Sequence, residues 1–226
     1  MFERLERLVG KEAVEKINQK NILLVGVGGV GGTVLEALVR SGIKNITIAD
    51  GDVFDESNLN RQILSTQEVI GQKKVDVAKK RVLDINKEAN IQTIDYNLTE
   101  EGISNLDKNY DFIIDACDDV KAKLELMKFA DINNISIICS MGTGKRLNPS
   151  MVKISTLNKT YNDPLSKKIR YEAKKMGINT NIPVVFSEEL PYNSDNVVAS
   201  SIFVPSCAAL NIAYYVIKKI IKPWLI

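Results

Sequence analysis

The chain has 226 residues, of which 45% are hydrophobic and 26% are charged, and its net charge is +2. This size and balance predict one globular unit with a sizeable core. The sequence contains no histidine, which excludes Ser-His-Asp and Cys-His catalysis and histidine-ligated metals. Its three cysteines form no CxxC pair, so we expect free thiols in a reducing cytoplasm and no zinc ribbon.

Apolar residues alternate along the chain between continuous strand-like runs and helical spacing. Such alternation predicts an α/β fold with a doubly wound, mostly parallel, Rossmann-like sheet covered on both faces. The pattern changes after residue 145, where we expect a smaller strand-helix extension of the same unit. The expected elements are helices at 3–19, 29–41, 72–86, 99–106, 119–133, 164–176 and 201–221, strands at 21–26, 45–50, 91–96, 111–116, 134–140, 151–157 and 182–187, and a flexible loop at 190–200.

The sequence GVGGVGG at 26–32 joins the first predicted strand to a predicted helix. Gly26, Gly28 and Gly31 match the dinucleotide fingerprint. The first glycine allows a tight turn, the second lets backbone N–H groups approach a phosphate, and the third lets the helix pack on the strand. Asp50 ends the next strand, where a carboxylate would hold a ribose hydroxyl. This context predicts a nucleotide site and argues against a glycine-rich turn without a ligand.

Further charged and amide side chains follow the predicted strands, in ADGDVFDESNLNRQ, GQKKVDVAKKR and DACDD. Because the carboxyl ends of parallel strands share one crevice, we expect these side chains to lie together. Glycine N–H groups, cations and carboxylates in one crevice suit a triphosphate with Mg²⁺ better than a pyrophosphate with a hydride acceptor. The candidates outside the glycine turn are Asp50, Asp52, Asn58, Asn60, Arg61, Lys74 and Asp118.

The motifs G-x-G-G-x-G, D-x-D, S-N-L-x-R-Q, G-Q-x-K and D-x-x-D occur in this order. With this order and spacing, residues 1–145 resemble the adenylating domain of the ubiquitin-activating-enzyme superfamily, which includes the ThiF and MoeB types. The resemblance implies that this domain binds ATP, with Gly29 against the phosphates and Asp50 on the ribose. It also implies that Asn58, Arg61 and Lys74 contact the phosphates, and that Asp118 helps to hold Mg²⁺.

Members of this superfamily are homodimers in which an N-terminal arginine reaches the triphosphate of the partner. Arg7 in ERLVG is the candidate for this catalytic role, with Arg4 second. The alternative is that Arg7 lies on a solvated helix face. Together with Arg61, Lys74 and Asp118, Arg7 completes the set of catalytic residues that the resemblance implies.

The second part of the chain indicates the branch of the superfamily. It lacks the two CxxC pairs of the sulfur-carrier adenylyltransferases, and GTGKRLNPSMVKISTLNKT, DPLSKKIR and PVVFSEELP resemble the tRNA threonylcarbamoyladenosine dehydratase branch. This implies adenylation of the threonyl carboxylate of a modified adenosine beside the anticodon, followed by attack of the neighbouring carbamoyl nitrogen. The alternative is an adenylyltransferase that activates the C-terminus of a ubiquitin-like sulfur-carrier protein. A sulfur-relay protein is a further candidate partner.

Basic residues are concentrated between 145 and 175, where nine basic residues accompany two acidic ones. Such a stretch can attract a polyanion even when the net charge of the chain is small. We expect residues 146–226 to bind tRNA and to pack in a dimer, with Lys145, Arg146 and Arg170 as tRNA contacts. The alternative for the lysines of helix 164–176 is the solvated face of an amphipathic helix.

The apolar segment 201–221 approaches the length of a membrane span. Pro205, Asn211 and the Lys218–Lys219 pair interrupt it, so we expect a buried or dimer-packing helix, with peripheral membrane contact as the alternative. The N-terminus MFERLERLVGKEAVEK has no apolar secretory region, and we expect a cytoplasmic protein. A nicotinamide-dependent oxidoreductase or a nucleotide-binding module without chemistry would not explain the charged motifs together.

Overall fold

The computed structural model describes residues 1–192 and 199–221. Within these residues, seven strands form one sheet in the order β3-β2-β1-β4-β5-β7-β6. Its neighbouring strands pair in parallel except β6, which runs antiparallel to β7 at the edge of the sheet. The predicted doubly wound, mostly parallel sheet is therefore confirmed. The strands are β1 Asn21–Val25, β2 Asn45–Ala49, β3 Asn90–Ile94, β4 Phe112–Asp115, β5 Ser136–Ser140, β6 Val152–Thr156 and β7 Pro183–Ser187.

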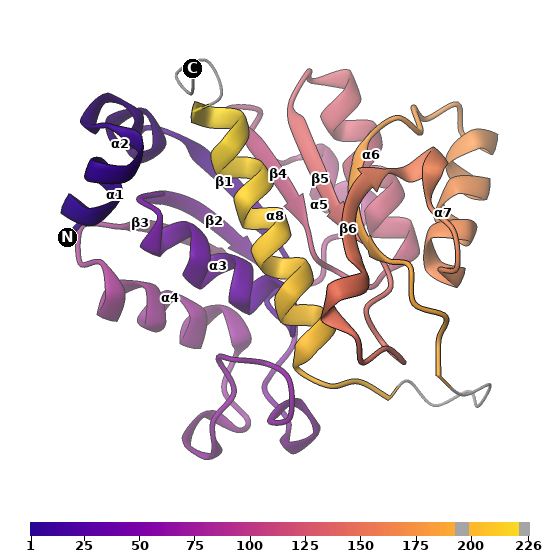
Figure 1. The fold of residues 1–226 in the computed structure, drawn as a ribbon, viewed down its shortest axis with the longest axis horizontal. Helices are drawn as coiled ribbons and strands as arrows, with labels where there is room; N and C mark the ends of the chain where they lie inside the picture. The colour runs from indigo at the N-terminus through magenta and orange to yellow at the C-terminus, as the bar shows by residue number, and fades with distance from the viewer. Residues whose placement is uncertain (193–198, 222–226) are drawn as a thin grey trace.

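Helices cover both faces of the sheet, and α8 crosses the near face in Figure 1. Alternate strand residues point to opposite faces: Ile22 and Leu24 pack in the core under α2, α3, α4 and α8, whereas Leu23 and Val25 pack under α5, α6 and α7. The helices are α1 Glu3–Val9, α2 Lys11–Asn18, α3 Gly31–Arg40, α4 Lys74–Ile85, α5 Glu100–Ser104, α6 Val120–Ile132, α7 Pro164–Lys175 and α8 Phe203–Ile221, with short 3-10 turns η1 Glu56–Asn58, η2 Gln67–Val69, η3 Pro149–Met151 and η4 Leu157–Lys159.

The expectation of one helix over 3–19 is wrong. Gly10 adopts φ +89° and ψ 149° and separates α1 from α2, because glycine tolerates a positive φ that ends a helix. The two helices also differ in packing, since α1 buries none of its residues while α2 buries Ala13, Val14 and Ile17. The helical spacing of apolar residues continues through Gly10, although the backbone changes direction at this residue.

The residues after β5 extend the same sheet through β7 and β6. Helix α8 packs on α3 and on these strands, and it buries Ala208, Ile212 and Val216. Length and composition would let α8 cross a membrane, and 44% of its apolar window is buried inside the protein. The division of function at residue 145 stays a prediction. Of the predicted loop 190–200, residues 193–198 lie outside the described residues.

Candidate active site

The glycine turn between β1 and α3 contains two glycines that the fold itself requires. Gly26 has φ +86°, and a Cβ atom there would lie 2.8 Å from the carbonyl oxygen of Ala116. A Cβ atom on Gly31 would lie 1.8 Å from the carbonyl oxygen of Gly26. The turn is therefore pressed against the end of β4, and α3 can start directly behind it only because Gly31 has no side chain.

Gly28 and Gly29 have no comparable contacts with the chain. A Cβ atom on Gly28 would come no closer than 3.7 Å to Gln62 Nε2, and one on Gly29 no closer than 3.5 Å to Arg61 Cγ. In addition, no side chain in the described part of the chain caps the N-terminus of α3. The chain's own packing does not explain these glycines, whereas a phosphate that approaches the backbone and the helix N-terminus does. The residues present thus fit the phosphates of a nucleotide.

Asp50 is fixed against the glycine turn at the end of β2. One of its carboxylate oxygens accepts a hydrogen bond from the Val27 N–H at 2.8 Å, and the other accepts from the Asp52 N–H at 2.9 Å. Lys74, the first residue of α4, has a side chain only 7% exposed, and its Nζ lies 2.8 Å from Asp52 Oδ2. The structure therefore brings the two predicted aspartates and the predicted lysine to one side of the turn.

The loop around η1 covers the turn from another side. The backbone oxygen and Cγ of Arg61 both lie 3.5 Å from the Cβ position of Gly29, and Arg61 Nη1 donates to the Ser57 carbonyl (2.7 Å) and Asn60 Oδ1 (3.0 Å). Asn60 donates to the Ser200 carbonyl at 2.9 Å, which ties this loop to the start of α8. Asn58 is buried, and its Oδ1 accepts from the Asp55 N–H at 3.2 Å, so in this structure it supports the loop.

The third predicted motif lies at the end of β4. Asp118 is exposed there. Asp115, the last residue of β4, forms a 2.9 Å ion pair with Lys123 in which neither side chain is exposed. Cys117 donates from its N–H and its thiol to Asp115 Oδ1. Burial, assisted by the charge of Asp115, raises the pKa of Cys117, and burial likewise raises the pKa of Cys139. Both thiols stay protonated at neutral pH and are poor nucleophiles.

Sequence reasoning missed Gln62 and the Asp115–Lys123 pair. Gln62 is buried beside Gly28, and its Oε1 has no hydrogen-bond partner among the described residues. The R-Q motif contained Gln62, so a polar residue next to Arg61 was a usable signal. Lys123 carried no signal, because its partners on β4 and β5 become its neighbours only when the strands pair.

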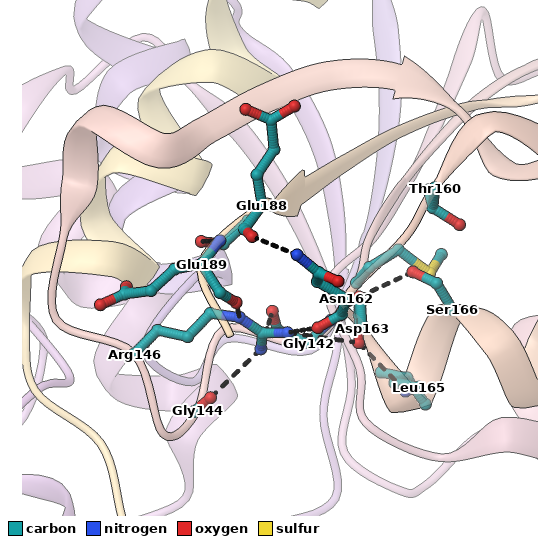
Figure 2. A network of polar contacts seen from close by, with 12 residues as sticks. Gly142, Gly144, Arg146, Thr160, Asn162, Asp163, Leu165, Ser166, Glu188 and Glu189 are labelled. Carbon is teal, nitrogen blue, oxygen red and sulfur yellow. Dashed lines mark hydrogen bonds and ion pairs between the residues drawn. The ribbon is translucent and has the colours of Figure 1, made fainter. Parts of the chain in front are cut away.

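The predicted tRNA contacts occupy three different environments. Lys145 is half-buried in the loop after β5, and Arg170 uses Nη1 to hold the Leu157 and Thr160 carbonyls at 3.2 and 3.0 Å. Arg146 is in the interior, with its side chain 2% exposed and its guanidinium bonded to backbone carbonyls (Figure 2). This burial argues against the predicted contact of Arg146 with tRNA. An arginine in a basic stretch of the sequence does not reveal its long-range acceptors. On α1, Arg7 is exposed and paired with Glu3 at 2.5 Å.

Comparison with known proteins identifies the family. The ThiF family model matches residues 2–223. The chain belongs to the ThiF family. The tRNA threonylcarbamoyladenosine dehydratase of Bacillus subtilis is 34% identical over 240 residues, covering 98% of this chain and 94% of the relative. That of Haemophilus influenzae is 37% identical over 175 residues, covering 77% and 67%.

Solved structures agree with the sequence comparisons. The Escherichia coli tRNA N6-threonylcarbamoyladenosine dehydratase in complex with ATP superposes with a TM-score of 0.91 at 28% identity, covering 98% of this chain and 94% of that one. By contrast, a sulfur carrier protein adenylyltransferase of Thermus thermophilus is 34% identical over 110 residues and covers only 49% of this chain. The match over almost the whole chain confirms the expected resemblance to the dehydratase branch of the family.

Proposed function

We propose that this protein is an ATP-dependent tRNA threonylcarbamoyladenosine dehydratase. The observation that carries the proposal is the similarity of nearly the entire chain to a dehydratase solved with ATP, combined with a crevice whose open glycines fit phosphates. The adenylyltransferases share only about half of the chain, so they support the adenylation chemistry and not the same substrate.

The reaction would activate a carboxylate, which is a poor electrophile because its leaving group would be oxide. A carboxylate oxygen of the threonyl group attacks the α-phosphorus of ATP, and pyrophosphate leaves. The carbamoyl nitrogen then attacks the activated carbonyl carbon, loses its proton, and releases AMP, which carries away the former carboxylate oxygen. The net change in the nucleoside is the loss of one water molecule. Both reacting groups belong to one side chain, which gives the cyclisation a high effective molarity.

The residues of the crevice have matching roles in this proposal. The turn around Gly28 and Gly29 would receive the phosphates, and Asp50 the ribose. Arg61 and Lys74 would exchange their present partners, the Ser57 carbonyl and Asp52, for phosphate oxygens as charge develops in the transition state. Asn58 and Asn60 would hold the loop around η1 that carries Arg61, and Asn60 already does so through its contact with Arg61.

Asp118 would hold Mg²⁺ together with the phosphates of ATP. Among the described residues, no group of three or more His, Cys, Asp or Glu side chains could bind a metal by itself. Mg²⁺ commonly binds through one or two carboxylates, several waters and substrate phosphates, which is the arrangement that one exposed aspartate at the crevice permits. When bound, the ion would neutralise charge on the transferred phosphate.

A basic face of α7 would contact the phosphates of tRNA. Lys167, Lys168 and Lys174 line a shallow hollow of about 500 Å³ together with the 59%-exposed Tyr171. The helix begins at the crevice edge, where Asp163 accepts a hydrogen bond from the Gly142 N–H, and its 12 residues span about 18 Å. This face replaces Arg146 as the proposed contact, alongside Lys145 and Arg170. The alternative of a solvated helix face predicts no effect of its charges on tRNA affinity.

A homodimer in which Arg7 reaches the crevice of a second copy stays a prediction from the resemblance, since the exposed Arg7–Glu3 pair on α1 also fits a solvated helix face. An exposed apolar stripe on α8, formed by Phe203, Leu210 and Tyr214, is a surface that such a dimer could cover. A sulfur-relay partner, a peripheral membrane contact and a cytoplasmic location stay predictions from the sequence.

The proposed function is tested by incubating the protein with ATP, Mg²⁺ and one of three acceptors: tRNA bearing threonylcarbamoyladenosine, unmodified tRNA, or a sulfur-carrier protein. We expect AMP, pyrophosphate and the cyclic nucleoside, detected by mass spectrometry, only with the modified tRNA. The Lys74→Met variant is the control for contaminating activity. Pyrophosphate formed only with the carrier protein, together with the adenylated carrier, would refute the proposal in favour of the adenylyltransferase function.

A further inference from the structure

Arg146 connects three separate segments at the carboxyl edge of the sheet (Figure 2). Its guanidinium donates from Nε to the Glu189 carbonyl (3.0 Å), from Nη1 to the carbonyls of Gly142 (2.8 Å) and Gly144 (3.2 Å), and from Nη2 to that of Asn162 (2.9 Å). These acceptors lie after β5, before α7 and after β7. A planar guanidinium with five donors suits such a junction, because it holds several carbonyl groups at fixed angles.

Two buried carboxylates complete the junction. Asp163 lies 3.8 Å from Arg146 Nη2, caps α7 by accepting from the Leu165 N–H at 3.0 Å, and accepts from the Gly142 N–H at 3.0 Å. Glu189 accepts from the backbone N–H groups of residues 147 and 148 at 2.9 Å each. Packing around Gly142 is tight, since a Cβ atom there would lie 2.6 Å from Asp163 Oδ1. The backbone of the loop 142–148 is therefore held by the side chains of Arg146, Asp163 and Glu189.

The junction lies beside the nucleotide half of the crevice. β5 is the neighbour of β4, which ends at the Asp115–Asp118 turn, and β7 is the next strand. Lys145, which adopts φ +57°, donates its N–H to the Ala199 carbonyl and accepts from the Tyr192 N–H, both at 2.7 Å. The chain from Ala199 leads into α8, where Pro205 Cβ lies 3.6 Å from the Cβ position of Gly29. The loop held by Arg146 therefore borders the crevice through the segment that leads into α8.

We propose that Arg146 is a positioning residue for the acceptor side of this active site. It fixes loop 142–148 and the start of α7 where the carboxylate of the modified adenosine meets the α-phosphate, and it does not itself contact tRNA. The inference rests on the proposed function. ATP would be held by the segments after β1, β2 and β4, so ATP affinity is independent of Arg146. The rate of cyclisation depends on Arg146, because a displacement of the reacting groups by about 1 Å can cost about 10²-fold in rate.

The test compares Arg146→Lys with Arg81→Lys. Lysine keeps the positive charge but cannot reproduce the planar set of donors. Arg81 is the matched control, because it lies on α4, is 46% exposed and bonds only Glu36 in the described residues. The assays measure ATP affinity and the rate constant of cyclisation, normalised to the concentration of enzyme that binds ATP. They also measure tRNA affinity between about 50 and 200 mM salt, which gives the slope of log affinity against log salt. For Arg146→Lys we expect unchanged ATP affinity, an unchanged salt slope and a rate lower by about 10²-fold; for Arg81→Lys we expect no change.

A normal rate for Arg146→Lys would overturn the inference. So would a salt slope reduced by about 0.7–0.9, which is the signature of one lost phosphate contact. If Arg146→Lys does not bind ATP, Gly142→Ala decides, because its Cβ displaces the same loop while the buried arginine stays; a normal rate in that variant overturns the inference. If the wild-type protein forms no AMP with modified tRNA, the proposed function fails and the inference with it. If the wild type is active, a normal rate in the variants refutes only the role of Arg146.

Discussion

Replacing Lys123 by methionine is expected to destabilise the protein strongly. Lys123 Nζ lies 2.9 Å from Asp115 Oδ2 and 2.7 Å from the Ser140 carbonyl, and both side chains of the pair are 0% exposed. Methionine fills much of the same space but leaves the carboxylate without its counter-charge. Breaking a buried pair from one side costs about 3–5 kcal/mol. For a protein of this size that corresponds to a melting temperature lower by roughly 10 °C.

Urea unfolding followed by circular dichroism measures this free energy in a double-mutant cycle of Lys123→Met, Asp115→Asn and the double variant. Because each single change leaves one buried charge unpaired, we expect the double variant to be more stable than the sum of the two single changes by about 2 kcal/mol. The reasoning would be refuted if Lys123→Met cost less than about 1 kcal/mol, or if the effects were additive within about 0.5 kcal/mol.

Three further predictions concern the crevice. Gly31→Ala places a Cβ 1.8 Å from a backbone oxygen and should prevent folding. Gly28→Ala has room for its Cβ, so it should keep its melting temperature while losing at least about tenfold in ATP affinity by calorimetry. An ATP affinity of Gly28→Ala equal to that of the wild type would contradict the phosphate role of this glycine. Lys74→Met should also lose about tenfold or more in ATP affinity, with little change in stability because its carboxylate partner is 58% exposed. Burial raises the pKa of Cys117 and Cys139, so native protein at pH 8 should react with iodoacetamide at these positions far more slowly than urea-unfolded protein.

Local patterns sufficed for the sheet and the nucleotide half of the site. Strand β1, the glycine turn and α3 are contiguous, so their hydrophobic periods and their glycines already report the final geometry. Asp50 and Lys74 could be placed because parallel strands end at one edge, and the structure joins them through Asp52. The break at Gly10 could not be read from periodicity, since the apolar spacing continues through it while the backbone does not.

The part of the site formed by loop 142–148 and α7 could not be predicted, because long-range contacts that no local sequence pattern contains determine it. Arg146 and Arg170 stand in the same basic stretch. Arg146 is buried among carbonyls that include that of Glu189, 43 positions away, whereas Arg170 is part-buried in the middle of α7. The sequence by itself determined the order of strands and helices, apart from the break at Gly10, and predicted a nucleotide crevice, because those properties depend mostly on neighbours along the chain. Only the tertiary structure decided which cations are available to tRNA and which hold the fold, because burial of a charge depends on partners brought together by strand pairing.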